Sequence, residues 1–225
     1  MNVKKLYTIG DSWTQGYGLR NPKTECYPYL ISKKLKCNLE NHALPAASND
    51  WMFRKTIQWI CSQKDLSDVL VIIGWSIPSR REENGKFYYG GPLEWAKRIN
   101  AVDDPVSKFI SEHLYDAKQI TKKLLVNVYS LQEVLKYHKI KYLFYQPWID
   151  ILIKDDWYEK NDKPDLSTYQ HRNDDVYDRI DKRFVIGPFE DAEKIAFQES
   201  RHPNSHEHSI MAEHLYNKII SLVKY

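Results

Sequence analysis

The sequence predicts an α/β protein built around a mostly parallel, five-stranded sheet. Short apolar runs that suit buried strands alternate along the chain with amphipathic segments of helical period. The clearest strand, residues 69–73, is continuously apolar, as expected for a parallel strand that helices cover on both faces. This alternation is typical of right-handed β-α-β connections, which place helices on both sides of a sheet.

Five short segments are predicted to be the strands of this sheet. The first is an alternating apolar run that stops at Gly10-Asp11-Ser12, a group of residues typical of a turn. The five segments are residues 4–9, 37–42, 69–73, 141–145 and 183–186.

Helical periodicity separates these strands. Residues 25–36 carry apolar side chains near a 3.6-residue period, and residues 49–63 do the same behind Asn49, which suits an N-cap. One or two helices are expected over residues 105–137, and a closing helix over residues 205–223.

The length of 225 residues suits a single domain that spans residues 1–225. The alternation breaks at about residues 75–104, where charged residues, glycines, prolines and aromatic residues are mixed. We interpret this stretch as an inserted loop or lid. Residues 146–182 are polar and aromatic, with no firm pattern.

Composition argues against several classes of protein. The formal net charge of +3 is small for this length and the lysine pairs are scattered, so no nucleic-acid partner is expected. No apolar run approaches the roughly 18 residues that a membrane span needs, and the N-terminus has no signal-peptide pattern. Three cysteines without CxxC spacing indicate a reduced compartment. We therefore expect a cytoplasmic protein without a cofactor, of an oligomeric state that the sequence leaves open.

Residues with side chains suited to catalysis follow the predicted strands. In parallel α/β folds, functional sites form at the carboxyl ends of the strands. Ser12 lies at the turn after the first strand and is the candidate nucleophile. A serine nucleophile needs a base within hydrogen-bond reach, and that base needs an orienting carboxylate. We predict that His202 is the base and that Glu199 orients its imidazole.

An oxyanion that forms during acyl transfer needs hydrogen-bond donors aimed at it. The predicted donors of this oxyanion hole are the backbone N–H of Ser12, a backbone N–H at Ala46 and the side chain of Ser76.

Four further residues near these turns are predicted to contact the substrate. Trp13 and Trp75 each lie beside a proposed catalytic turn, and we expect them to wall an acyl pocket. Asn49 ends the loop after the second strand. Arg80 begins a charged run that could bind a polar substrate, although such a run more often forms a solvated face.

These motifs resemble those of the SGNH/GDSL hydrolase superfamily, in the family order and across essentially the whole chain. Gly10-Asp11-Ser12 matches the first block, and residues 41–49 resemble the second. Gly74-Trp75-Ser76 stands in the place of the third block, and Glu199-x-x-His202 in the place of the last.

Three positions depart from the family pattern. Ala46 replaces a glycine, and its N–H remains available unless the position needs a positive φ. Ser76 replaces the asparagine of the oxyanion hole, and its hydroxyl has a shorter reach than an asparagine amide. Loss of one such donor typically lowers kcat by ~10²–10³. Glu199 replaces an aspartate and should keep its role if the loop adjusts.

The resemblance implies a flavodoxin-like three-layer sandwich with a Ser12–His202–Glu199 triad that hydrolyses esters or transfers acyl groups. We favour hydrolysis of a short acyl ester on a small molecule or glycan, such as an acetyl group on a carbohydrate. The alternatives are an acyltransferase with the same triad, and a carbohydrate-binding protein that has lost catalysis.

Two other patterns compete for the same residues. Ser76 lies in a Gly-x-Ser-x-Pro sequence that resembles a nucleophile elbow, but the elbow needs a final glycine and a helix that starts at once. A cluster near the C-terminus invites a metal hypothesis, yet Pro203 interrupts its helical spacing. The cluster comprises Glu199, His202, His206, Glu207, His208 and His214. We predict surface histidines at a helix start, and no metal site.

Overall fold

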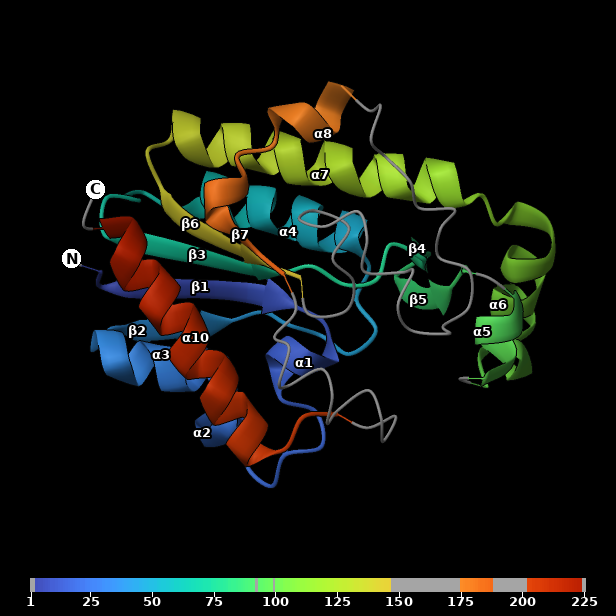
Figure 1. Cartoon of the computed structure of the whole chain (residues 1–225), viewed down its shortest axis with the longest axis horizontal. Helices are drawn as coiled ribbons and strands as arrows, with labels where there is room; N and C mark the ends of the chain where they lie inside the picture. The colour runs from blue at the N-terminus through green and yellow to red at the C-terminus, as the bar shows by residue number, and fades with distance from the viewer. Residues whose placement is uncertain (1–2, 92, 99, 147–174, 188–201, 224–225) are drawn as a thin grey trace.

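The computed structural model describes residues 3–91, 93–98, 100–146, 175–187 and 202–223. A five-stranded sheet of order β2-β1-β3-β6-β7, parallel at every pairing, forms its centre (Figure 1). The strands are β1 (Lys5–Gly10), β2 (Asn38–Asn41), β3 (Val69–Gly74), β6 (Lys141–Tyr145) and β7 (Val185–Ile186). The predicted α/β class, with its parallel five-stranded sheet, is therefore confirmed.

Helices cover both faces of this sheet and complete the three layers. One face carries α4 (Asn49–Ser62) and α7 (Ala117–Tyr137), and the other carries α3 (Tyr27–Leu35) and α10 (Ser205–Val223), as Figure 1 shows. The short helices are α1 (Ser12–Gln15), α2 (Pro22–Glu25), α5 (Leu93–Arg98), η1 (Ala101–Asp103), α6 (Pro105–Phe109), η2 (Ile110–Leu114), α8 (Asp175–Arg179) and η5 (Lys182–Phe184).

Strand β3 contributes to two separate apolar cores, one on each face of the sheet. Val71 and Ile73 point into the core under α4 and α7, whereas Leu70 and Ile72 point into the core under α3 and α10. Because both faces are covered, the strand is apolar at every position rather than at every second one.

The helix predicted over residues 25–36 is instead two helices, α2 and α3, which Cys26 separates. Cys26 has an extended backbone, with φ −68° and ψ 149°. Pro28 lies in the first turn of α3, where the missing N–H removes no intrahelical hydrogen bond. The proline is therefore compatible with a helix that begins at Tyr27.

The stretch interpreted as an inserted loop or lid contains a second sheet. Strands β4 (Arg80–Glu83) and β5 (Lys86–Tyr89) pair antiparallel. Asn84 and Gly85 join them with φ values of +50° and +76°. A two-residue type I′ turn needs positive φ at both positions, and Asn-Gly is the sequence that best supplies it. This dipeptide marks a hairpin inside the charged run.

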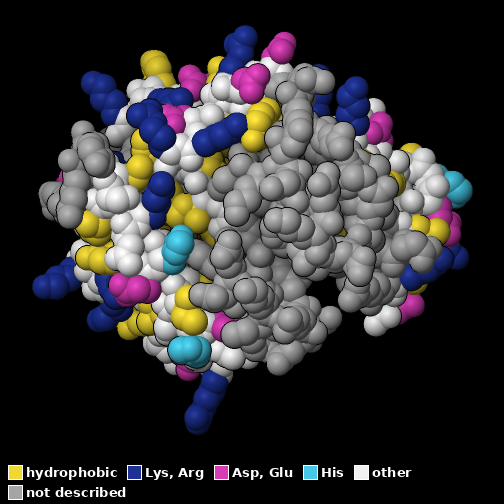
Figure 2. All heavy atoms as spheres, viewed as in Figure 1, with side chains coloured by type: hydrophobic (Ala, Val, Ile, Leu, Met, Phe, Trp, Pro, Cys, Tyr) yellow, Lys and Arg dark blue, Asp and Glu magenta, His cyan; other side chains and the backbone are white. Residues whose placement is uncertain are grey.

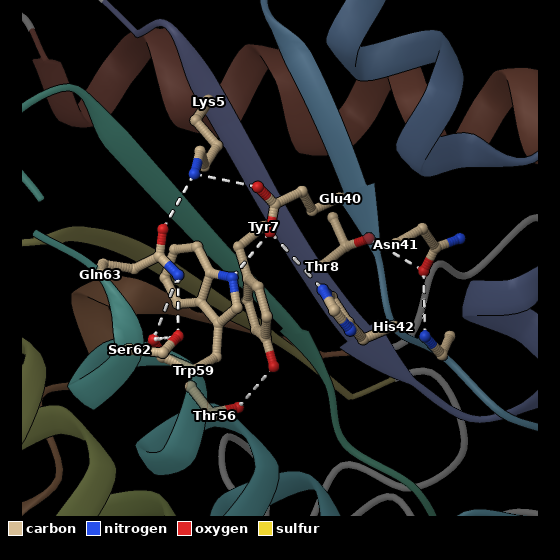
Figure 3. Close-up of polar contacts among 11 residues, drawn as sticks. Lys5, Tyr7, Thr8, Glu40, Asn41, His42, Thr56, Trp59, Ser62 and Gln63 are labelled. Carbon is tan, nitrogen blue, oxygen red and sulfur yellow. Dashed lines mark hydrogen bonds and ion pairs between the residues drawn. The ribbon is translucent and has the colours of Figure 1, made fainter. Parts of the chain in front are cut away.

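The edge strand β2 is held to the rest of the fold by a polar network around Glu40 (Figure 3). Glu40 accepts a hydrogen bond from Nε1 of Trp59 at 2.7 Å and forms an ion pair with Nζ of Lys5 at 2.9 Å. Lys5 also donates to Oε1 of Gln63, beyond the end of α4, at 2.9 Å. These contacts join β1 and β2 to the C-terminal end of α4 and so hold the edge strand in place.

Charged side chains of both signs share the surface. On the face that Figure 2 shows, Lys and Arg side chains lie among Asp and Glu rather than in one patch. One example of an exposed ion pair is Lys4 with Asp68, at 2.6 Å. Such pairs contribute little to stability, because water and salt screen the two charges. Within the described ranges, no helix combines the length and the apolar character that a membrane crossing requires.

Two glycines at the carboxyl ends of β1 and β3 make room for α1. Gly10 and Gly74 are register partners on the neighbouring strands. The Thr14 side chain lies against both glycines, and its hydroxyl is hydrogen-bonded to the Tyr27 hydroxyl at 2.9 Å. A Cβ at position 10 would lie 2.6 Å from the Thr14 Cβ, and one at position 74 would lie 3.0 Å from the Tyr27 Oη. Glycine at both positions therefore lets α1 rest directly on the sheet edge.

We expect Gly74→Ala to lower the free energy of unfolding by about 1–3 kcal/mol, because the added methyl group meets Thr14 and Tyr27 in a filled space. Urea denaturation measures this loss. In a Thr14→Ala background the same substitution should cost less, because the hydroxyl that the methyl group meets is gone. An equal cost in both backgrounds would show that Thr14 does not require the glycine.

Candidate active site

Ser12 is the first residue of α1, two residues after the carboxyl end of β1. Asp11 caps this short helix, because its Oδ1 accepts a hydrogen bond from the Trp13 N–H at 3.0 Å. The Ser12 N–H belongs to the first helical turn, where backbone N–H groups have no acceptor within the helix. One residue therefore presents both a hydroxyl and a backbone donor at the sheet edge.

His202 approaches Ser12 from the far end of the chain. Its Nε2 lies 2.9 Å from the Ser12 Oγ, which is hydrogen-bond distance. The half-buried ring also packs against Tyr17, with 4.9 Å between ring centroids. The structure thus brings together the predicted nucleophile and the predicted base, which are 190 positions apart in sequence.

A capping box just after His202 fixes where the chain enters α10. The Glu207 N–H donates to Oδ1 of Asn204 at 3.0 Å, and the Asn204 N–H donates to Oε2 of Glu207 at 2.6 Å. This reciprocal pair satisfies two donors at the helix start and sets the first residue of the helix. His202, two positions before Asn204, is positioned by this entry into α10.

The pKa of the His202 imidazole is lowered, first by burial and then by the positive charge of Arg80, while Asp11 acts in the opposite direction. A neutral imidazole at pH 7 can accept the Ser12 proton, as a general base must. Glu199 lies outside the described residues, so its role in orienting His202 stays a prediction.

Ser76 lies beside the nucleophile turn, and its hydroxyl is directed to Asp11. The Ser76 Oγ donates to Oδ2 of Asp11 at 2.9 Å, and both side chains are buried. Asp11 thereby ties the end of β3 to α1. A hydroxyl has one proton to donate, so Ser76 would have to rotate away from Asp11 to serve an oxyanion. Its predicted role as a side-chain donor stays a prediction.

Asn49 is the first residue of α4 and not its N-cap, in contrast to the sequence prediction. Ser48 caps the helix, because its Oγ accepts a hydrogen bond from the Trp51 N–H at 3.2 Å. The Asn49 amide instead binds the main chain of Ser76, accepting from its N–H at 2.8 Å and donating to its carbonyl at 3.0 Å. Asn49 therefore fixes the turn after β3, and its predicted contact with substrate stays a prediction.

Ala46 has the left-handed backbone that the family glycine would supply. The loop after β2 runs beside β1, with the Leu44 N–H donating to the Gly10 carbonyl at 3.1 Å. The Ala47 N–H then donates to the Leu44 carbonyl at 3.2 Å, which closes a turn centred on Pro45 and Ala46. The φ of Ala46 is +61°, a value that glycine adopts with less strain. The position does need a positive φ.

Trp13 and Trp75 lie in the apolar cores on opposite faces of the sheet. Both side chains are buried, and the Trp75 ring packs edge-on against Phe144 at 5.4 Å between centroids. Both rings therefore pack in the interior next to the candidate site. Their predicted role as walls of one acyl pocket stays a prediction.

The prediction of surface histidines at the start of α10 is wrong for His208. Its side chain is fully buried, and its Nδ1 accepts a hydrogen bond from the Tyr27 N–H at 3.2 Å, which joins α10 to α3. Burial lowers the pKa of His208 to about 4. His206 is exposed, as predicted. Among the residues that the structure describes, no group of three potential ligands is arranged to hold a metal ion.

Gln146 is a buried polar residue of the same sheet edge that the sequence motifs did not indicate. It directly follows β6, and its backbone N–H donates to the Ile186 carbonyl at 2.9 Å. The side chain is fully buried, and neither its Oε1 nor its Nε2 has a hydrogen-bond partner within the described part of the chain. The sequence signal that could have indicated Gln146 is its position directly after the fourth predicted strand, at the edge where function collects.

Residues 9–224 match a protein family described as "Family of unknown function (DUF6071)". No curated protein sequence matches the chain.

The fold is shared with solved structures of esterases. The psychrotrophic esterase EstA from Pseudoalteromonas sp. is 13% identical, with a TM-score of 0.57 over 99% of this chain and 100% of that one. A putative lipolytic protein of the G-D-S-L family from Desulfitobacterium hafniense DCB-2 is 12% identical, with a TM-score of 0.51 over 96% and 99%. The acetyl xylan esterase AlAXEase is 15% identical, with a TM-score of 0.50 over 97% and 99%. The predicted resemblance to SGNH/GDSL hydrolases is confirmed at the level of the fold.

We expect Ala46→Gly to raise the free energy of unfolding by up to about 1 kcal/mol. A left-handed backbone costs a residue with a Cβ roughly 1–2 kcal/mol, and the greater freedom of glycine in the unfolded chain offsets part of that gain. Ala101→Gly is the control, because the backbone there is not left-handed, and it should destabilise by roughly 0.5–1 kcal/mol. A loss of stability in Ala46→Gly would contradict the assigned strain.

We expect His208 to make the fold sensitive to mild acid. Its pKa is about 4 in the folded chain against 6.5 when unperturbed, so the unfolded state binds the proton more tightly. The stabilisation from the neutral ring is complete above pH 6.5 and is lost as the pH falls toward 4, by up to about 3 kcal/mol. Urea denaturation of the wild type and of His208→Asn at pH 7 and pH 4.5 measures this. The decrease should be smaller in the variant, and an equal decrease would contradict the assignment.

Proposed function

We propose that this chain, a member of the DUF6071 family of unknown function, is a serine esterase. Its proposed substrate is a short acyl ester, such as an O-acetyl group on a carbohydrate. The observation that carries the proposal is the 2.9 Å contact between the Ser12 Oγ and the His202 Nε2. The contact lies at the carboxyl edge of a parallel sheet, where such folds collect function. The shared fold of the esterases supports the same conclusion.

The proposed reaction follows the order of a serine hydrolase. His202 takes the proton as the Ser12 Oγ attacks the acyl carbonyl, and it returns that proton to the leaving alcohol. Water then hydrolyses the acyl-enzyme with His202 again as the base. The backbone N–H groups of Ser12 and Ala46 are the proposed donors to the oxyanion, and Glu199 is the proposed orienting carboxylate.

The proposed substrate rests on the surroundings of Ser12 and on the fold relatives. Trp13 and Trp75 fill the interior close to the nucleophile turn, which favours a short acyl group over a long one. One fold relative is an acetyl xylan esterase, and that name motivates an acetylated carbohydrate.

A carbohydrate-binding protein without catalysis is the second candidate. The observation that favours it is the Ser76 hydroxyl, which donates to Asp11 where the related hydrolases place an oxyanion donor. Such a protein would bind its ligand equally well after Ser12→Ala.

We expect a fluorophosphonate probe to label Ser12, because the probe reacts with an activated serine and needs no natural substrate. The solved structure of the Pseudoalteromonas esterase was obtained inhibited by monoethylphosphonate, a related reagent. Peptide mass spectrometry locates the adduct. Labelling should fall at least about 10²-fold in His202→Ala, because the base that takes the Ser12 proton is removed.

His206→Ala is the matched control, since this exposed histidine lies four positions further along the chain and its loss should leave labelling unchanged. An adduct on Ser76 would favour the nucleophile-elbow hypothesis instead. A folded wild-type protein without any adduct would make the binding protein the leading candidate.

A further inference from the structure

Arg80 is a cation near the candidate active site whose guanidinium forms no ion pair with another described residue. It begins β4, and its backbone N–H donates to the Ile77 carbonyl at 3.3 Å, which also accepts from the Asn49 amide at 3.4 Å. Its Nε is buried and has no hydrogen-bond partner within the described residues, and none of the ion pairs found there includes its guanidinium. By contrast, the nearby Arg54 is exposed and contacts both oxygens of Glu82, at 3.0 and 2.8 Å.

Hydrogen bonds connect the start of β4 to the nucleophile turn. Asn49, which shares the Ile77 carbonyl with the Arg80 N–H, accepts from the Ser76 N–H, and the Ser76 hydroxyl donates to Asp11 beside Ser12. In keeping with this proximity, the Arg80 charge helps to lower the pKa of His202. A molecule bound at Ser12 can therefore extend to Arg80.

A second polar side chain without a partner among the described residues lies beside the turn after β3, where Ser76 contacts Asp11. The β6 residue Tyr145 is the register partner of Gly74, and its carbonyl accepts a hydrogen bond from the Trp75 N–H at 2.8 Å. Gln146 follows at once, and its fully buried amide has no partner within the described part of the chain. An amide of this kind offers two donors and an acceptor, which matches the hydroxyl groups of a sugar.

Unpartnered buried groups destabilise a fold, and a charge does so more than an amide. Packing alone would favour apolar side chains at positions 80 and 146. Their polar character is explained if a ligand satisfies both groups when it binds. A guanidinium pairs best with a planar or tetrahedral oxyanion, through two parallel hydrogen bonds.

We propose that the substrate is an ester of an acidic sugar, whose carboxylate pairs with Arg80 and whose hydroxyl groups bind Gln146. The inference rests on the proposed esterase function and deepens it by naming the substrate class. We favour a carboxylate over a phosphate because Arg80 balances a single negative charge, whereas a phosphate dianion would bring an unbalanced charge close to Asp11.

The test compares two sugars that differ only in charge, a methyl hexuronoside with one O-acetyl group and the methyl ester of its carboxyl group. Acetate release gives kcat/KM for each. The wild type should prefer the acid by at least tenfold, and Arg80→Gln should bring the ratio near one. Arg80→Lys should restore part of the preference, because it returns the charge without the planar fork. Arg54→Gln removes an exposed guanidinium and should keep the full preference.

Two outcomes of this comparison would overturn the proposal. One is equal kcat/KM for the two sugars in the wild type, and the other is a preference that survives in Arg80→Gln. The second outcome includes equal fold losses of kcat/KM on both sugars, which would mean that the Arg80 charge acts at the reacting centre and not on the substrate carboxylate.

Calorimetry on Ser12→Ala separates this inference from the proposed function, because binding needs no turnover. The acid should bind at least tenfold tighter than its methyl ester, and the difference should vanish when Arg80→Gln is added. Equal binding would overturn the inference, even if Ser12 is labelled by the fluorophosphonate. A 6-phosphate sugar with the same acetyl group should bind more weakly than the acid, and tighter binding would overturn the choice of carboxylate.

Gln146→Leu gives a readout that a purely structural role would not produce. Removal of an unpartnered buried amide should raise the denaturation midpoint of the free protein while it weakens the binding of both sugars. A lower midpoint with unchanged binding would overturn the assignment of Gln146.

Discussion

The close approach of α1 to the sheet is the constraint on which the rest of the site depends. Gly10 and Gly74 meet across β1 and β3, and because neither has a Cβ the Thr14 side chain can lie against both. The first helix therefore begins without an intervening loop, with Asp11 as its cap and Ser12 in its first turn. From this position Ser12 contacts His202 and Asp11 contacts Ser76, so the two glycines determine where the nucleophile turn lies.

Buried polar bonds, rather than apolar packing, connect the segments of the site. Asp11 joins α1 to the turn after β3, and Asn49 joins α4 to that same turn. Removing one partner of either buried pair leaves the other unsatisfied, which costs about 1–3 kcal/mol. The exposed Asn41 adds a further bond between β2 and α1, because its Nδ2 donates to the Thr14 carbonyl at 3.2 Å. The edge around Ser12 is therefore held in one arrangement, while the apolar cores stabilise the fold as a whole.

The sequence predicted the sheet and the Ser12–His202 contact because apolar runs and family motifs are local signals. It did not predict the hairpin from β4 to β5, because the charged residues of β4 lack the apolar alternation that marks a strand, although Asn84-Gly85 is a typical hairpin turn. The burial of His208 was not predictable from its helix, because it depends on a backbone N–H that α3 brings to it. The bond from Ser76 to Asp11 likewise joins residues 65 positions apart, which no motif encodes.

Two features near the nucleophile turn lower the stability of the fold: the left-handed backbone of Ala46, and the Arg80 charge, which has no partner among the described residues. They indicate that selection acts on this region for a property other than folding. Ala46 has a left-handed backbone that a glycine would relieve, yet its turn is the proposed source of an oxyanion donor. With the Ser76 hydroxyl bound to Asp11, the proposed oxyanion at Ser12 would depend on main-chain donors. Selection for stability alone would remove both the strain at Ala46 and the Arg80 charge, which has no ion-pair partner among the described residues. Their presence beside the Ser12–His202 pair is what a site kept for binding an anion and for acyl chemistry would show.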